Sequence, residues 1–123
     1  MLIWPTGTKV LVCTRPADMR CGFDTLARHV RDYLGEDPLT GHLFVFGNRR
    51  GDRLKILYWD RDGYALWSKR LEAGTFRLPL VEPQTTPGPY RWELTADELG
   101  LLLRGIALAT VRRHPRYQRP VSA

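Results

Sequence analysis

The stretch GHLFVFGNRRGDRLKILYWDRDGYALWSKRL, residues Gly41–Leu71, decides the fold. It contains three runs rich in aliphatic and aromatic residues, at His42–Phe46, Leu54–Trp59 and Tyr64–Leu71. Segments of Gly, Asn, Asp and Arg separate these runs, and such residues favour tight turns. Short strands joined by tight turns pair as neighbours in an antiparallel sheet. The stretch therefore predicts a three-stranded β-meander with arginine-rich turns.

The second turn, Asp60–Gly63, sets the register of the last two strands. Gly63 suits the left-handed position of a three-residue loop closed by a bulge, which would pair Asp60 with Tyr64. That register places Lys55, Leu57 and Trp59 on one face with Ala65, Trp67 and Lys69, and Leu54, Ile56, Tyr58, Leu66 and Ser68 on the other. Two interpretations of Trp59 and Trp67 stay open: a platform on which bases stack between lysines, or a surface buried by a second layer.

Further strands and a first helix are expected around the meander. Lys9–Thr14 has the β-branched composition of a strand, and Thr75–Leu78 and Tyr90–Leu94 are candidates for two more. Apolar residues recur at helical spacing before Gly35, which predicts one helix with a buried stripe formed by Phe23, Leu26, Ala27, Val30 and Leu34.

A second helix is expected after Thr95. Thr95-Ala-Asp-Glu98 has the pattern of a capping box, in which the Thr hydroxyl and the Glu carboxylate bond each other's backbone amides. The apolar residues that follow at helical spacing would dock this helix on the sheet; they are Leu99, Leu102, Leu103, Ile106 and Ala109.

These elements predict an α+β fold, in which a small antiparallel sheet of the meander plus one or two strands packs with two helices. The chain has 123 residues, which suits one domain, and we expect it to span residues 1–110. Residues 111–123 follow a stretch without acidic side chains and contain Pro115 and Pro120. We expect a basic, flexible C-terminal arm there.

The charge is biased toward arginine. Sixteen arginines and three lysines face 13 acidic residues, for a net charge of +6. The planar guanidinium forms two-point contacts with phosphate or carboxylate, so this excess favours nucleic acid or an acidic protein as partner. A merely solubilising surface is the alternative.

No segment indicates export or a membrane. The N-terminus lacks the pattern of a signal peptide, and no stretch approaches the ~18 apolar residues of a membrane span. Cys13 and Cys21 fit no zinc-binding spacing, so free thiols are expected. The sequence predicts a cytoplasmic protein with neither metal nor cofactor.

Residues that could perform catalysis do not converge in the sequence. His29, His42 and His114 are scattered, and none stands at a telling distance from a Cys or a carboxylate. Gly47–Gly51 lacks the Gly-Lys-Ser/Thr ending of a phosphate-binding P-loop. We therefore predict no catalytic residue and no enzyme activity.

The arginine-rich turns are the candidate site. Arg49, Arg50 and Arg53 occupy the first turn, and Arg61 occupies the second. With Lys55 and Lys69 behind them, these side chains could contact a DNA phosphate backbone. The alternative is an ordinary solvated turn.

Several short motifs resemble a known family. They are Thr8-Lys-Val, Asp18-Met-Arg, Gly22-Phe-Asp24, Gly41-His-Leu-Phe-Val-Phe46, Arg50-Gly-Asp-Arg-Leu-Lys55, Tyr58-Trp-Asp60, Asp62-Gly63 and Lys69-Arg-Leu71. In these the chain resembles the TnpB accessory proteins of insertion-sequence family sixty-six, which are encoded by the element's second open reading frame. The resemblance implies a role in transposition beside a separate, larger transposase, where the acidic residues that cut and join DNA are expected.

Together these observations predict a non-catalytic accessory protein that supports transposition by binding DNA, with the element ends as the expected target. The alternative is a protein-interaction module that bridges or regulates the transposase without touching DNA. The sequence leaves the oligomeric state open.

Overall fold

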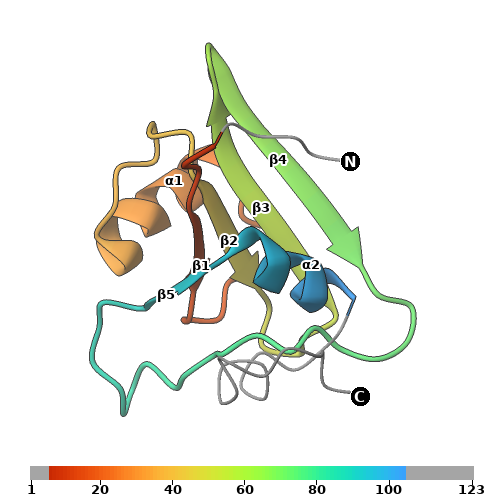
Figure 1. The fold of residues 1–123 in the computed structure, drawn as a ribbon. Coiled ribbons are helices and arrows are strands. Elements are labelled where there is room, and N and C mark those ends of the chain that lie inside the picture. The colour runs from red at the N-terminus through yellow and green to blue at the C-terminus, as the bar shows by residue number, and fades with distance from the viewer. Residues whose placement is uncertain (1–5, 105–123) are drawn as a thin grey trace.

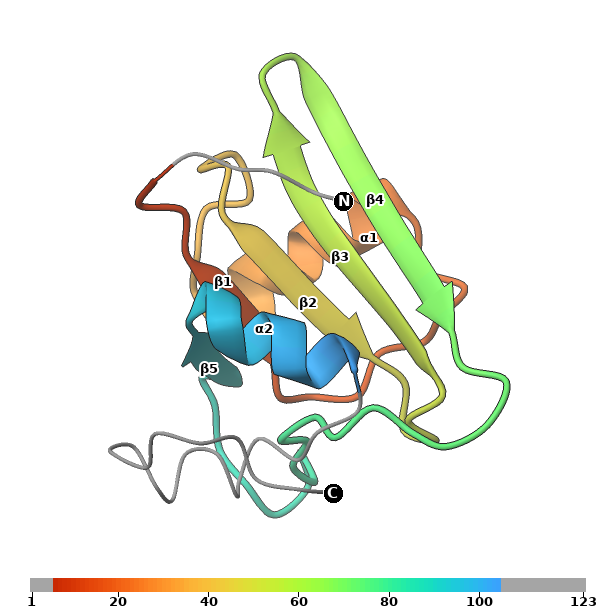
Figure 2. The same ribbon diagram turned by 45° about the vertical axis from the view of Figure 1, so that its right-hand side comes forward.

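The computed structural model describes residues 6–104. They form a five-stranded sheet in the order β4-β3-β2-β1-β5, with helices on both faces (Figures 1 and 2). The strands are β1 (Val10–Cys13), β2 (Leu43–Gly47), β3 (Arg53–Asp60), β4 (Gly63–Arg70) and β5 (Arg91–Leu94). The helices are α1 (Phe23–His29), η1 (Val30–Leu34) and α2 (Ala96–Leu103). The predicted α+β fold is confirmed.

The sheet is mixed rather than wholly antiparallel. β1 and β2 run parallel, joined by the crossover that contains α1 and η1, while β5 pairs antiparallel with β1. The meander of β2, β3 and β4 is antiparallel, as its sequence predicted. Thr75–Leu78 is not a strand: its Phe76 N–H donates to the Gly51 carbonyl at 2.7 Å, and the segment runs past the β2–β3 turn.

The helix after β1 is a continuous helical segment whose second part, η1, is a π-helix. It ends at Gly35, in the left-handed conformation at φ +66°, and the Glu36 N–H bonds the Val30 carbonyl at 3.1 Å. This is the helix-ending geometry that favours glycine. The predicted apolar stripe is buried except for Phe23, which is 48% exposed because it is the first residue of the helix.

One core layer lies between the sheet and α1 with η1. It contains Leu26, Ala27, Val30 and Leu34 from the helices and Leu11, Cys13, Phe44, Phe46 and Leu57 from the strands. We call this side of the sheet the α1 face. Burial of this layer holds the crossover in place.

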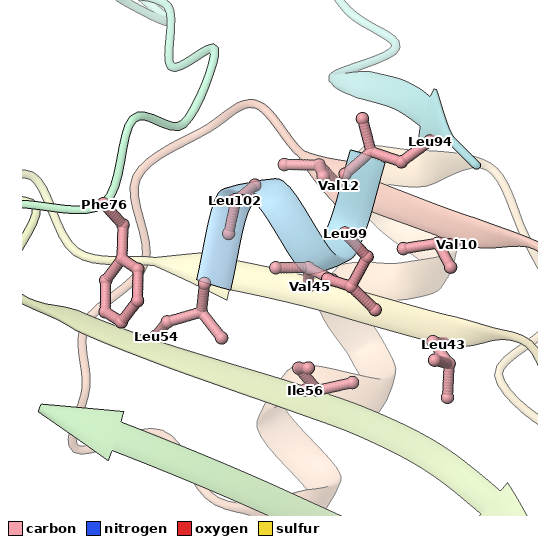
Figure 3. Close-up of a cluster of buried hydrophobic side chains, with 10 residues drawn as sticks. All are labelled: Val10, Val12, Leu43, Val45, Leu54, Ile56, Phe76, Leu94, Leu99 and Leu102. Atoms are coloured by element: carbon pink, nitrogen blue, oxygen red, sulfur yellow. The ribbon is translucent and has the colours of Figure 1, made fainter. Parts of the chain in front are cut away.

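The second core layer lies between the sheet and α2. Figure 3 shows Leu99 and Leu102 of α2 above Val45 and Ile56, with Phe76 beside Leu54. Helix α2 begins with the predicted capping box: the Glu98 N–H donates to Thr95 Oγ1 at 3.1 Å, and the Thr95 N–H donates to Glu98 Oε1 at 2.9 Å. We call this side the α2 face. Ile106, Ala109 and the predicted basic arm at 111–123 lie outside the described residues.

The predicted register between β3 and β4 is wrong by one residue. Asp60 pairs with Gly63 and Trp59 with Tyr64, across a two-residue turn in which Arg61, not Gly63, has a positive φ of 59°. The predicted register would have put Lys55 directly opposite Lys69, and like charges in that position repel. In the observed register the like-charged pair is Arg53 opposite Arg70, at the solvent-exposed end where Glu72 lies 3.1 Å from Arg70.

This shift turns the β4 side chains over relative to β3. Trp67 lies opposite Ile56 and packs against the α2-face core, whereas Trp59 shares the α1 face with Tyr64, at 5.2 Å between ring centroids. The two tryptophans lie on opposite faces of the sheet. The shared platform of Trp59 and Trp67 with Lys55 and Lys69 is therefore ruled out.

No helix in residues 6–104 is long and apolar enough to cross a membrane.

Candidate nucleic-acid interface

The topology gathers arginines at one end of the sheet. The parallel strands β1 and β2 end there, β4 also ends there, and the antiparallel strands β3 and β5 begin there. In Figure 2 the arrowheads of β2 and β4 point toward this end, and the β3–β4 turn lies at the other. Six arginines lie at or just beyond these strand ends: Arg15, Arg49, Arg50, Arg53, Arg70 and Arg91. We call this the arginine end.

The opposite end of the sheet has a different charge. The β3–β4 turn there carries Arg61 between Asp60 and Asp62, and α2 starts there with Asp97 and Glu98. Within residues 6–104, the opposite end also carries Lys9, but its acids outnumber its cations, so positive charge is concentrated at the arginine end.

The β2–β3 turn is held in shape by Asn48. Its Oδ1 accepts from the backbone N–H groups of Gly51 at 2.9 Å and Arg53 at 3.1 Å, and its Nδ2 donates to Asp52 at 2.7 Å. The hydrogen bond from Asn48 is the main reason that the pKa of Asp52 lies below its usual value. Gly51 takes φ +84°, a conformation that disfavours other residues. The turn thus presents Arg49 and Arg50 from a fixed backbone.

Carboxylates accompany many of these arginines. Four pairs join arginine-end cations to acids: Arg49–Glu82 at 2.7 Å, Arg50–Asp52 at 3.9 Å, Arg70–Glu72 at 3.1 Å and Arg91–Glu36 at 2.5 Å. Most of these side chains are exposed, so each pair contributes little to stability and can exchange partners. Of the six arginines, Arg15 and Arg53 form no ion pair within residues 6–104.

The structure brings together only part of the predicted site. Arg49, Arg50 and Arg53 lie at the arginine end, exposed to solvent. Lys55 lies on the α1 face and donates from Nζ to the Cys21 carbonyl at 3.0 Å, while Lys69 lies opposite Leu54 on the α2 face. Arg61 lies at the other end of β3, roughly 25 Å away along the strand.

Sequence reasoning missed Arg15, Arg70 and Arg91. The guanidinium of Arg15 lies 4.4 Å from the ring centroid of Tyr33 and 5.7 Å from that of Tyr90, a cation–π contact that fixes its position. Each missed arginine lies at the end of a predicted strand or directly beside one. The sequence shows that each of these arginines lies at a strand end, but only the strand order shows that these strand ends lie at the same end of the sheet.

The cysteines and His42 do not form a further site with one another. Burial raises the pKa of the Cys13 thiol to about 11, and both cysteines are free thiols. His42 accepts the Lys9 N–H at 3.0 Å, a structural contact at the start of β2. No three His, Cys, Asp or Glu side chains within residues 6–104 are grouped so that they could hold a metal ion.

Comparison with known proteins assigns the family. The family model described as "IS66 Orf2 like protein" matches residues 8–113. The chain belongs to this family. Its members include the second-frame products of an insertion sequence, which agrees with the motifs noted above.

Two proteins of Sinorhizobium fredii are similar over nearly the whole chain. "Uncharacterized protein y4jC" is 36% identical over 109 residues, covering 89% of this chain and 88% of its own. "Uncharacterized protein y4hO" is 38% identical over 114 residues, covering 91% and 90%. No solved structure matches the chain significantly. The comparisons therefore support an insertion-sequence accessory protein without describing how it acts.

Proposed function

We propose that this chain is a non-catalytic accessory protein that supports transposition of a bacterial insertion sequence by binding duplex DNA through the arginine end. The observation that supports this proposal is that six arginines lie together at one end of the sheet, while the opposite end carries acidic side chains. Arginine forks fit phosphate oxygens, and contacts to phosphates position a protein on DNA. Membership of the family supports a role beside a transposase. A protein in that role would act in the cytoplasm, where DNA ends are handled.

Arg50 and Arg53 are the residues we expect to contact phosphate first. Both are exposed, Arg50 is held only loosely at 3.9 Å from Asp52, and Arg53 has no ion pair within residues 6–104. Neither needs to give up a strong interaction with a carboxylate before it meets DNA. Arg49 must first leave Glu82, at 2.7 Å.

A salt titration tests the proposal. Affinity for a labelled duplex carrying an element end should fall steeply with rising salt, because cations bound to the phosphates are released on binding. The double substitution Arg50→Gln, Arg53→Gln should reduce the slope of log affinity against log salt by about one for each phosphate that the variant no longer binds.

Arg61→Gln is the matched control. It removes one positive charge, half of what the double variant removes, from an exposed turn at the opposite end of β3, and it should leave affinity and slope close to those of the wild type. Absence of binding at low salt would refute the proposal. Equal losses per charge removed, in Arg61→Gln and in the double variant, would show that only net charge matters.

A second candidate is a protein-interaction module that bridges or regulates the transposase. The observation in its favour is that four of the six arginines at the arginine end already lie beside carboxylates, which reduces the net field available to DNA. Co-purification with the transposase from nuclease-treated extract, in a chain that fails the salt titration, would favour this function.

A further inference from the structure

β4 forms one edge of the sheet and pairs only with β3 within the described residues. Edge strands of soluble proteins are usually short, bulged, or interrupted by proline or charge. β4 has eight residues in an unbroken ladder without proline, and its middle, Tyr64–Trp67, carries no charge. The other edge, β5, has four residues and carries Arg91 and Glu93. The charges of β4, Lys69 and Arg70, are confined to its end, so the middle of the strand lacks the protection that β5 has.

The hydrogen-bonding groups of β4 alternate in direction. The Leu71 N–H donates to the Asp52 carbonyl at 2.8 Å, in line with the register in which Gly63 pairs with Asp60. In an antiparallel ladder every second residue bonds the partner strand. Odd-numbered residues therefore bond β3, and the N–H and C=O groups of Tyr64, Leu66, Ser68 and Arg70 point away from the sheet.

We propose that β4 pairs antiparallel with β4 of a second copy of this chain, around a two-fold axis at Leu66, to form a continuous ten-stranded sheet. In this register Tyr64 lies opposite Ser68 of the second copy, and Ala65 lies opposite Trp67 of the second copy. The small side chain of Ala65 thus lies beside the large side chain of Trp67 from the second copy. Because the axis is perpendicular to the sheet, both α1 faces lie on the same side.

Charge selects both the partner and the register. Asp62 precedes β4 and Arg70 ends it, so an antiparallel copy brings each acid opposite the other copy's arginine, twice in the dimer. An axis at Trp67 would place Asp62 opposite Glu72. An axis at Ala65 would place Asp62 opposite Ser68 and form no ion pair. Like charges repel in the Trp67 register, so of these three axes only the one at Leu66 places opposite charges against each other.

Exposed apolar surface lies beside this edge. Helix α1 packs over β3 and β4, and its first residue, Phe23, is 48% exposed. Figure 2 shows α1 behind these two strands. Tyr64 and Leu66 lie half-buried on the same face. A second copy at this edge would cover their open sides.

Sedimentation equilibrium of the full chain, over a concentration series and without DNA, tests the proposal. The expected mass at high concentration is twice 14.2 kDa. Ser68→Pro removes an outward N–H without touching the bonds to β3, so it should fold with the same circular dichroism and yet be monomeric. Ser68→Ala keeps the N–H, and it should dimerise as the wild type does.

Charge exchange tests the register. Asp62→Arg and Arg70→Asp should each weaken dimerisation several-fold, and the two substitutions together should restore it, because each pair is re-formed with reversed signs. A wild type that is monomeric throughout would overturn the proposal. A dimer that persists in Ser68→Pro, or a double variant as weak as the single ones, would also overturn it. Because no DNA is present, these outcomes are independent of the proposed function.

Discussion

The imidazole ring of His29 lies 4.9 Å from the ring of Tyr33 and 6.4 Å from that of Phe46. Its pKa is lowered from 6.5, first by burial and then by the positive charges of Arg28 and Arg15. The aromatic contacts and the guanidinium of Arg15, which lies over Tyr33, thus favour a neutral ring. His29 is therefore part of the packing between helix and sheet.

This setting predicts how stability depends on pH. Because the folded-state pKa of His29 is lower than the unfolded value, the unfolded chain binds the proton first, and the free energy of unfolding falls as pH drops through and below about 6.5. His29→Phe keeps an aromatic ring and cannot titrate. The free energy of unfolding, measured with urea, should therefore fall less between about pH 7.5 and about pH 5.5 in this variant than in the wild type. An equal fall in the free energy of unfolding in the wild type and in His29→Phe would show that His29 does not cause the pH dependence.

At the scale of elements, the β3–β4 hairpin differs most from its prediction. Its two-residue turn requires a positive φ at the first central position, and Arg61 occupies that position at 59°. Such turns favour glycine there, yet the glycine of this turn, Gly63, lies in the strand. Apolar residues face both sides of the hairpin, because both faces of the sheet are covered. Hydrophobic alternation therefore could not select the register.

Arg61→Gly should relieve this strain. We expect a gain of up to about 1 kcal/mol in the free energy of unfolding, since a side chain at a left-handed φ costs more than the flexibility of glycine. Asp62→Gly is the matched control, because Asp62 has no positive φ and glycine there should only destabilise. Thermal unfolding of both variants would measure the difference. A loss of stability in Arg61→Gly as large as that in Asp62→Gly would contradict the argument.

At the scale of the whole molecule, ion pairs join distant parts of the chain at the arginine end. Arg49 in the β2–β3 turn pairs with Glu82 in the segment before β5, and Arg91 of β5 pairs with Glu36 after the helix. These carboxylates neutralise part of the charge of the proposed DNA-binding surface. Because the exposed Arg49–Glu82 pair contributes little to stability, Glu82 can be changed at little cost to the fold.

Glu82→Gln should strengthen DNA binding, in contrast to the arginine substitutions. It frees Arg49 for phosphate, so the slope of log affinity against log salt should steepen by about one. Asp60→Asn makes the same charge change at the opposite end of the sheet and should have little effect. The measurement is the salt titration proposed for the arginine variants, applied to both carboxylate variants. Weaker or unchanged binding in Glu82→Gln would mean that Arg49 does not reach DNA.

The sequence by itself determined the α+β class, the meander, the helix before Gly35, the capping box at Thr95 and the family motifs. These features depend on neighbours a few residues apart, and local periodicity and turn chemistry report such neighbours directly. Only the tertiary structure decided that β1 runs parallel to β2, which face Trp67 occupies, and that Arg15, Arg70 and Arg91 meet the arginines of the β2–β3 turn. Those outcomes depend on strand order and register, which are selected by packing on two apolar faces and by repulsion between distant charges.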